Sequence, residues 1–278
     1  MRLVATPDPD RREDSAPPPV RGRRRAQVLA AVQYVVVMGG AAWLLWRGAA
    51  AMQYEWQWAR VPELLMAGGR PGPLLLGLFA TLRISVLAMG LAAVLGVGLA
   101  LANLSASWSA VRLSAALIGL VRNTPLIVQV SLFYFVIAPV FGIDRFWSGV
   151  ASLALFESVF IAHIVRSGLL AVPVGQWEAG MALGLGRGVL LRRVVLPQML
   201  RLMLPPLTNT AVSLVKDSAI VSVIALFELT TAGRNAISDT YMSFEIWLTV
   251  AALYLALTFA MSLAARALER RLARPYQT

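Results

Sequence analysis

Residues 176–197 read Gln176-Trp-Glu-Ala-Gly-Met-Ala-Leu-Gly-Leu-Gly-Arg-Gly-Val-Leu-Leu-Arg-Arg-Val-Val-Leu-Pro197, a moderately polar, arginine-bearing stretch between two very hydrophobic segments. Glycines at positions 184, 186 and 188 interrupt it. We expect a short helix before these glycines, a sharp bend at them, a second short helix over 189–195, and a new element opening at Pro197. The result is an elbow that presents small side chains and arginines to a partner. An ordinary loop is the plainer interpretation.

The first short helix carries its own start signals. Gly175 can act as its cap, and Glu178 then falls in the first turn. A carboxylate there is favoured by the positive end of the helix dipole.

The composition around this stretch is that of a membrane protein. The chain has 278 residues, of which 58% are hydrophobic and 14% charged, and its mean hydropathy is +0.70. A soluble domain carries about 25% charged residues. Several apolar runs are long enough to cross a bilayer, which takes roughly 20 residues. We therefore predict an all-α integral membrane protein.

Six transmembrane helices follow from the apolar runs, with a Pro- and Arg-rich tail before the first. We expect the tail to be disordered, because it has little apolar surface to bury. The expected spans cover about residues 28–46, 74–104, 115–141, 149–172, 202–229 and 244–265, joined by polar links at 47–73, 105–114, 143–148 and 230–243.

Two smaller features of these spans carry expectations. Pro125 suits the first turn of a helix, which Asn123 or Thr124 could cap. Gly90, Gly96 and Gly98 punctuate the second span, which in membranes indicates close helix contact.

Arginine distribution sets the predicted orientation. The net charge is +11, and arginine supplies all but one of the basic residues. With six spans and the N-terminus inside, most arginines fall on one side, and cytoplasmic loops collect basic residues. Both termini and the elbow at about 175–197 are therefore predicted to be cytoplasmic. This explanation of the charge is preferred to nucleic-acid binding.

Several chemistries have no residues to support them. Cysteine is absent and there is one histidine, so disulfides, thiol chemistry and metal catalysis are not expected. A phosphate-binding Walker loop needs Gly-Lys-Ser/Thr, but the single lysine, Lys216, follows Val215 inside a predicted span. If transport is driven by ATP, the ATPase is another chain.

Polar residues inside the predicted spans are the candidates for a substrate path. Ionisable groups there cost about 2.5–3.5 kcal/mol each on insertion scales. Asn209, Ser213 and Lys216 share one helix face, and Asp217 is next to Lys216 in sequence. These groups either form buried pairs between helices, which we weigh somewhat higher, or line the path.

The fourth span and the third add three more candidates. Glu157 and His163 lie in the fourth span, where a packed or hydrogen-bonded histidine is the simpler interpretation. His163 and Arg166 are three residues apart and can be neighbours. Gln129 is a further candidate for lining the path.

The elbow resembles the EAA motif of ATP-binding-cassette (ABC) importer permeases. Glu178-Ala-Gly180, three residues, Gly184, nine residues and Val194-Val-Leu-Pro197 have the family's spacing. Gly180 stands where the family has alanine, and a helical glycine costs roughly 1 kcal/mol against alanine, so we expect a more flexible elbow. The resemblance covers about 74–272. Further stretches similar to the polar amino-acid subfamily are 122–129, 172–178, 196–201, 205–209 and 216–218.

The resemblance implies a type I ABC importer-like permease core with an extra N-terminal helix. The elbow is then the coupling helix, and its ATPase-coupling residues are Glu178, Ala179, Gly180, Gly184, Leu196 and Pro197. The implied domains are a cytoplasmic tail (1–25), the extra helix and outer loop (26–73), the permease domain (74–272) and a C-terminal tail (273–278).

The resemblance also implies partners and a location. These are two ATP-binding subunits, a second permease chain that is identical or homologous, and a periplasmic or surface substrate-binding protein, all at the inner (plasma) membrane. The chain itself holds no cofactor, because the ATPase subunit binds the ATP. The implied substrate is a polar amino acid or a related small solute.

One departure bears on the substrate. The subfamily usually has glutamate where this chain has His163, and a glutamate is found instead at Glu157. This departure argues against a basic amino acid as substrate. The alternative from another class is an ion-coupled secondary transporter or channel that uses the intramembrane charges. Such folds often show inverted repeats, and we find no internal repeat in this sequence. A membrane enzyme ranks third, since no nucleophile–base pair is evident.

Overall fold

The computed structural model describes residues 20–51 and 54–273, and the chain divides between Trp56 and Gln57 into two units. The first unit holds helix α1, Val20–Ala51, whose described side chains are exposed throughout. Its stretch Gln27–Gly48 is long and apolar enough to cross a membrane, as expected for the first span. Residues 20–25, predicted to be disordered, belong to this helix; residues 1–19 lie outside the described part.

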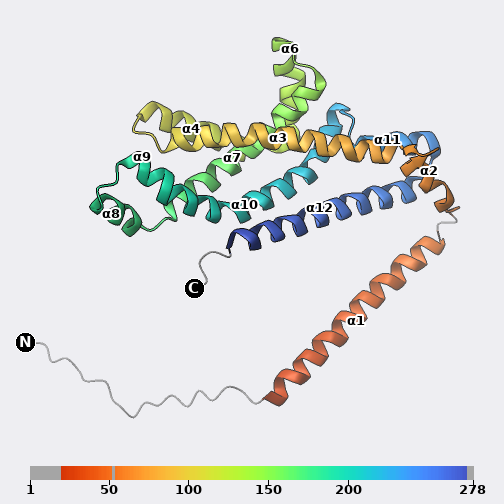
Figure 1. The fold of residues 1–278 in the computed structure, drawn as a ribbon. Helices are drawn as coiled ribbons and strands as arrows, with labels where there is room; N and C mark the ends of the chain where they lie inside the picture. The colour runs from red at the N-terminus through yellow and green to blue at the C-terminus, as the bar shows by residue number, and fades with distance from the viewer. Residues whose placement is uncertain (1–19, 52–53, 274–278) are drawn as a thin grey trace, which may run out of the picture. The chain divides into compact units, whose positions relative to one another are not determined.

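The second unit is built from long helices, four of which qualify as membrane spans by length and composition (Figure 1). A further helix pair would make one more span, so the described residues hold five or six candidates. The main helices are α3 (Pro73–Asn103), α4 (Trp108–Arg122), α5 (Leu126–Leu132), η2 (Phe133–Ile137), α6 (Ala138–Phe141), α7 (Arg145–Leu170), α10 (Leu196–Asp217), η4 (Ser218–Ile224) and α12 (Ser243–Ala273).

The core of this unit forms where α3 packs along α7. A Cβ on Gly96 would lie 2.7 Å from the Ser158 carbonyl oxygen and 2.7 Å from the Ile161 Cβ, so only glycine permits this approach. Gly90 and Gly98 have nothing within 4 Å of that position. The predicted close contact is therefore confirmed for Gly96 and wrong for the other two within this chain.

The expected third span is broken rather than straight. α4 and α5 meet at an angle of 108°, at the residues before a proline that disfavours helix. Asn123 and Thr124 donate side-chain hydrogen bonds to the carbonyls of Gly119 (2.8 Å) and Leu120 (2.9 Å). They therefore close the end of α4. The prediction that one of them caps the next helix is wrong, since Pro125 holds that position.

Two predicted links are shorter than expected because polar side chains start helices inside them. Ser107 accepts from the Ala110 amide and begins α4, so only 105–107 remain of the first link. Asp144 accepts from the Trp147 amide at 2.9 Å and begins α7 inside the expected loop 143–148.

The expected loop at 47–73 contains short elements in its described part. These are η1 (Trp58–Arg60), α2 (Val61–Leu65) and an antiparallel hairpin of β1 (Met66–Ala67) with β2 (Arg70–Pro71). Gly68 and Gly69 make its turn with φ of 56° and 78°, which glycine adopts readily.

The link predicted at 230–243 is mostly a helix, α11 (Leu229–Thr240). Glu228, fully buried, begins it by accepting from the amides of Thr230 and Thr231, both at 2.7 Å. The hydroxyl of Tyr254 donates to the same carboxylate at 2.9 Å. A glutamate cap in a polar stretch is an unusual signal, and the sequence did not reveal it.

Candidate functional site

The elbow consists of α8 (Val174–Ala182), a turn, and α9 (Arg187–Leu190). α8 ends in a Schellman motif: the Leu185 amide donates to the Gly180 carbonyl (3.1 Å) and the Gly184 amide to the Met181 carbonyl (3.0 Å). Gly184 holds the left-handed position of this motif, with φ of 74°. The predicted bend after a short helix is confirmed, and the need for glycine at 184 has a backbone cause.

Gly180 allows the two arms of the elbow to pack. It is buried, and a Cβ at this position would lie 2.2 Å from the Cδ1 atom of Leu190. Leu190 comes from α9 and is 1% exposed. Gly180, which stands where the family has alanine, is therefore a close-packing residue. A leucine from the other arm fills the space that the methyl group of alanine would take.

The ends of the elbow differ from the expected ones. Pro173 occupies the N-cap position of α8, so Gly175 lies inside the helix and Glu178 lies beyond its first turn. The second arm does not stop at Pro197. α9 continues through the π-helix η3 (Leu191–Val195) into α10, where Pro197 sits in the first turn.

A continuous helical stretch, Arg187–Ile224, therefore begins in the elbow and is long and apolar enough to cross a membrane. It starts well before the expected span at 202–229. Pro205 and Pro206 lie inside it, where each lacks a backbone N–H.

The outer surface of the elbow combines apolar and charged side chains. Val174, Met181 and Leu183 are 69%, 54% and 79% exposed. Around them the other exposed positions include Glu178, Ala179, Gly184, Arg187, Arg192, Arg193, Leu196 and Pro197. Trp177 turns inward and packs against the core. Exposed apolar residues rimmed by charges are typical of a protein-docking surface.

Within the membrane-spanning part, a polar cavity of ≈ 320 Å³ lies against α7 and α10. α7 supplies two aromatic rings and a carboxyl group, and α10 supplies an amide, two hydroxyls and a carboxyl group. Its lining residues are Phe156, Glu157, Phe160, Asn209, Thr210, Ser213 and Asp217. Four of the seven predicted path residues, Glu157, Asn209, Ser213 and Asp217, are thus brought together.

The two carboxyl groups of this cavity are neighbours. Glu157 is 2% exposed and Asp217 is partly buried, and their side chains lie within hydrogen-bonding reach of each other. Helix periodicity explains the arrangement, because Asn209, Ser213 and Asp217 recur every four residues on one face of α10.

Lys216 is not on this face, contrary to the prediction. It is exposed and does not line the cavity. Adjacent residues are about 100° apart around a helix. The side chain of Lys216 therefore points away from the cavity that its neighbour Asp217 lines.

Gln129 and His163 have contacts of other kinds. The Gln129 amide donates to the carbonyls of Val121 (2.7 Å) and Thr124 (3.0 Å), tying α5 to the end of α4. The Nε2 atom of His163 lies 2.9 Å from an Arg122 guanidinium nitrogen. Since arginine can only donate, the imidazole accepts this hydrogen bond. Neither residue lines the polar cavity, so the structure does not place them with the other candidates.

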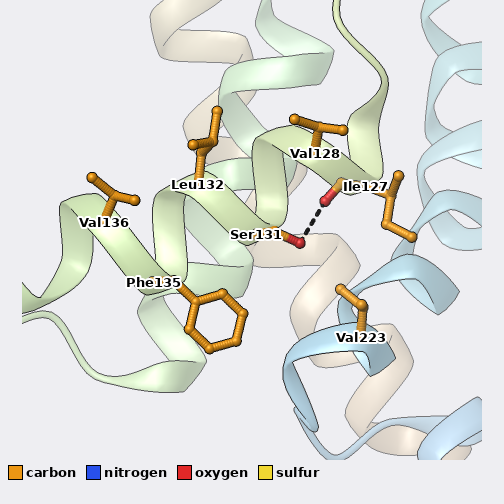
Figure 2. Close-up of a pocket in the computed structure, with 7 residues that line it drawn as sticks. All are labelled: Ile127, Val128, Ser131, Leu132, Phe135, Val136 and Val223. Carbon is orange, nitrogen blue, oxygen red and sulfur yellow. Dashed lines mark hydrogen bonds between the residues drawn. The ribbon is translucent and has the colours of Figure 1, made fainter.

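The second unit also contains apolar hollows, of which two are of similar size. One of ≈ 390 Å³ lies between α5–η2 and η4, and Ser131, its only polar side chain, donates to its own helix at Ile127 (Figure 2). The other, also ≈ 390 Å³, holds Arg83 with its guanidinium 4.7 Å from the centre of the Phe146 ring. The first offers hydrocarbon to a helix or a lipid, not a site for a polar solute.

Residues 94–274 match the family described as binding-protein-dependent transport system inner membrane component. The chain belongs to this family. The match includes the elbow, the polar cavity and the continuous helix between them. The chain is accordingly a multi-pass inner-membrane permease subunit of an ABC importer, and not itself an enzyme; the ATPase of such a system is a separate subunit.

The matches to curated relatives cover most of each relative's length. The glutamine transport system permease protein GlnP of Escherichia coli (strain K12) is 36% identical over 226 residues, covering 80% of this chain and 99% of the relative. The octopine transport system permease protein OccM of Rhizobium radiobacter is 36% identical, covering 68% and 81%.

Solved structures agree with the fold. An amino acid ABC transporter with histidines matches with a TM-score of 0.67 and 35% identity, covering 72% of this chain and 94% of that one. The methionine ABC transporter MetNI, in an inward-facing conformation, matches with a TM-score of 0.64 at 23% identity, which supports the helical arrangement alone.

Proposed function

We propose that this permease subunit imports a polar amino acid, or a related small solute, through a path that includes the polar cavity of α7 and α10. The observation that supports this proposal is the cavity itself, in which two carboxyls, an amide and two hydroxyls from α7 and α10 come together. Intramembrane polar clusters mark solute pathways. Curated relatives are described as permease proteins of glutamine, octopine, arginine and L-cystine transport systems, which fits a polar amino acid or a related solute.

The proposed assembly has two ATP-binding subunits, a second permease chain that is identical or homologous, and a periplasmic or surface binding protein. The ATPase subunits dock on the elbow and contact Glu178, Ala179 and Gly184 together with its exposed apolar residues. In this arrangement the elbow and both termini are cytoplasmic. The binding protein delivers the solute on the other side.

The proposed domain division keeps residues 74–272 as the permease domain, with the elbow at about 175–197. Residues 26–73 form an additional first helix and outer loop, and 1–25 and 273–278 are cytoplasmic tails. The break between the two units, after Trp56, falls inside the proposed outer loop.

Reconstitution tests this function. The permease would be co-expressed with its ATPase and binding protein, placed in proteoliposomes and assayed for uptake of labelled amino acids with and without ATP. Uptake that needs ATP, and that is lost when Glu178→Arg weakens co-purification of the ATPase, is expected. Glu63→Arg, the same charge change at an exposed position of α2 outside the elbow, serves as the control. Uptake driven by an ion gradient without ATP would refute the proposal.

A further inference from the structure

Arg83 places a positive charge on an apolar helix without an acidic partner. It belongs to α3, which qualifies as a membrane span, and its side chain is exposed. Its guanidinium lies 4.7 Å from the centre of the Phe146 ring, and among the described residues no carboxylate pairs with it. An aromatic face attracts a cation without neutralising its charge. Because a charge within the membrane is costly, an anion from outside this chain would stabilise it.

The hollow beside this guanidinium is apolar. It has a volume of ≈ 390 Å³, within the range of ligand pockets, about 300–1,000 Å³. Apart from Arg83, its lining side chains are aromatic or aliphatic and come from α3, the start of α7 and the segment between η4 and α11. They are Phe79, Ala80, Phe146, Leu226 and Phe227. A cation in the wall of an apolar hollow suits a ligand with an anionic group at one end and hydrocarbon at the other.

The hollow lies at the end of α7 that is remote from the elbow. Phe146 follows directly on Arg145, the first residue of α7, whereas the elbow begins just beyond the other end of this helix. Since α7 qualifies as a membrane span, its first turn marks a membrane–water interface. Trp147, in the same turn, is exposed, and tryptophan is enriched at such interfaces. Lipid headgroups lie at this depth, with the hydrocarbon of their acyl chains directly beneath.

The charged groups next to the hollow are already engaged. Arg145 donates to the Tyr134 hydroxyl and to the Ala225 carbonyl, both at 3.3 Å. Both of these partners are neutral, so Arg145 adds to the positive charge at this end of α7. Asp144 accepts from the Trp147 amide at 2.9 Å and begins the helix. The local charge therefore favours an anionic headgroup, since basic side chains near a membrane surface attract such lipids.

We propose that this hollow binds one anionic phospholipid. Its phosphate accepts hydrogen bonds from the Arg83 guanidinium, whose planar set of donors matches a phosphate, and one acyl chain lies against Phe79 and Phe227. The bound lipid joins α3 and α7 to the segment that follows η4. The hollow shares no lining residue with the polar cavity, so the inference goes beyond the proposed function and holds for any solute.

Lipid binding to the purified permease–ATPase complex tests this site. The complex would be titrated in detergent with phosphatidylglycerol, which is anionic, or with phosphatidylcholine of the same acyl chains, which is zwitterionic. Native mass spectrometry would count the bound lipids and give their dissociation constants. We expect one phosphatidylglycerol to bind at least about tenfold more tightly than phosphatidylcholine, because the Arg83 charge is then compensated.

Three variants locate the effect. Arg83→Gln should weaken the tightest phosphatidylglycerol by about tenfold, since the charged donor is lost. Phe227→Ala keeps the charge and should weaken the same lipid severalfold, because apolar contact with the acyl chain is lost. Arg70→Gln, the same charge loss at an exposed position of β2 outside the hollow, is the control and should have no effect. Unaltered phosphatidylcholine binding shows that each variant is folded.

A soluble competitor distinguishes a lipid from a free anion. Glycerol 3-phosphate carries a phosphate without acyl chains and should not displace the bound lipid. The inference is overturned if the unmodified complex binds both lipids equally, if Arg83→Gln keeps the tight phosphatidylglycerol, if Arg70→Gln loses it equally, or if glycerol 3-phosphate displaces it. Each of these results can occur while uptake remains ATP-dependent, in which case the proposed function stands.

Discussion

Replacing Gly180 by alanine tests how the elbow is held together. The new Cβ would lie 2.2 Å from Leu190 Cδ1, whereas non-bonded carbons settle at about 3.5–4.0 Å. Leu190 must therefore move by more than about 1 Å, and it is 1% exposed. Overpacking of this kind costs about 1–3 kcal/mol. The higher helix propensity of alanine offsets roughly 1 kcal/mol of this cost. The elbow is therefore destabilised by a net amount of up to about 2 kcal/mol.

Gly175→Ala is the matched control, because it lies in the same helix and a Cβ there has nothing within 4 Å. Amide hydrogen exchange reads the local effect through Gly184 and Leu185, whose N–H groups close the Schellman motif. A loss of 2 kcal/mol corresponds to exchange about thirtyfold faster. We expect these amides to exchange faster in Gly180→Ala and at an unchanged rate in the control. ATP hydrolysis by the complex should respond less strongly to delivered substrate in the same variant.

A double-mutant cycle completes the test. Leu190→Ala removes the atom that the new methyl group would meet, so Gly180→Ala should cost little or nothing in that background. Contacting residues couple by about 0.5–3 kcal/mol in such cycles. If Gly180→Ala exchanges no faster than Gly175→Ala, or costs the same with and without Leu190, the close-packing explanation of this glycine is wrong.

Three further changes probe the backbone and the buried polar groups. Gly184→Ala should lower the stability of the elbow by about 1–2 kcal/mol, since alanine disfavours the φ of 74°; exchange at the same amides measures it, and unchanged rates would contradict the left-handed turn. Gly96→Ala should destabilise the permease in thermal unfolding, because the methyl group meets the backbone of α7, whereas Gly98→Ala should not; equal melting temperatures would refute the close approach. Tyr254→Phe should cost about 1–3 kcal/mol in the same assay, as the buried carboxylate at the start of α11 loses a donor, and no loss would mean that water replaces it.

Hydrophobic length and turn chemistry predicted the spans and the elbow well. Apolar runs located every candidate membrane helix, and the glycine at 184 indicated the bend, because both signals are local. The helix ends were less predictable. Ser107 and Asp144 begin helices inside stretches whose polarity resembled loops, and the amphipathic α11 has too few apolar residues to stand out before its packing partners are known.

The polar cavity shows where sequence reasoning stops. Spacing placed Asn209 and Ser213 on one face of a helix, but it could not decide which of the adjacent residues Lys216 and Asp217 continues that face at the end of α10. Nor could it show that Glu157, from another helix, meets Asp217. Contacts between helices depend on how they are rotated, which no single-helix pattern determines. The same limit hid the leucine that fills the space beside Gly180.

The unbroken helix from Arg187 to Ile224 joins the elbow to Asp217 in the polar cavity, so the two can move together. About 30 residues at 1.5 Å each separate the elbow from Asp217, roughly 45 Å, so a tilt of about 10° at the elbow end would move the far end about 8 Å sideways. Pro205 and Pro206 lie between the two ends, where missing N–H groups make a helix easiest to bend. The helix therefore bends most easily at these prolines. In the proposed assembly, a movement that the ATPase imposes on the elbow would be divided there between displacing the cavity wall and flexing the helix.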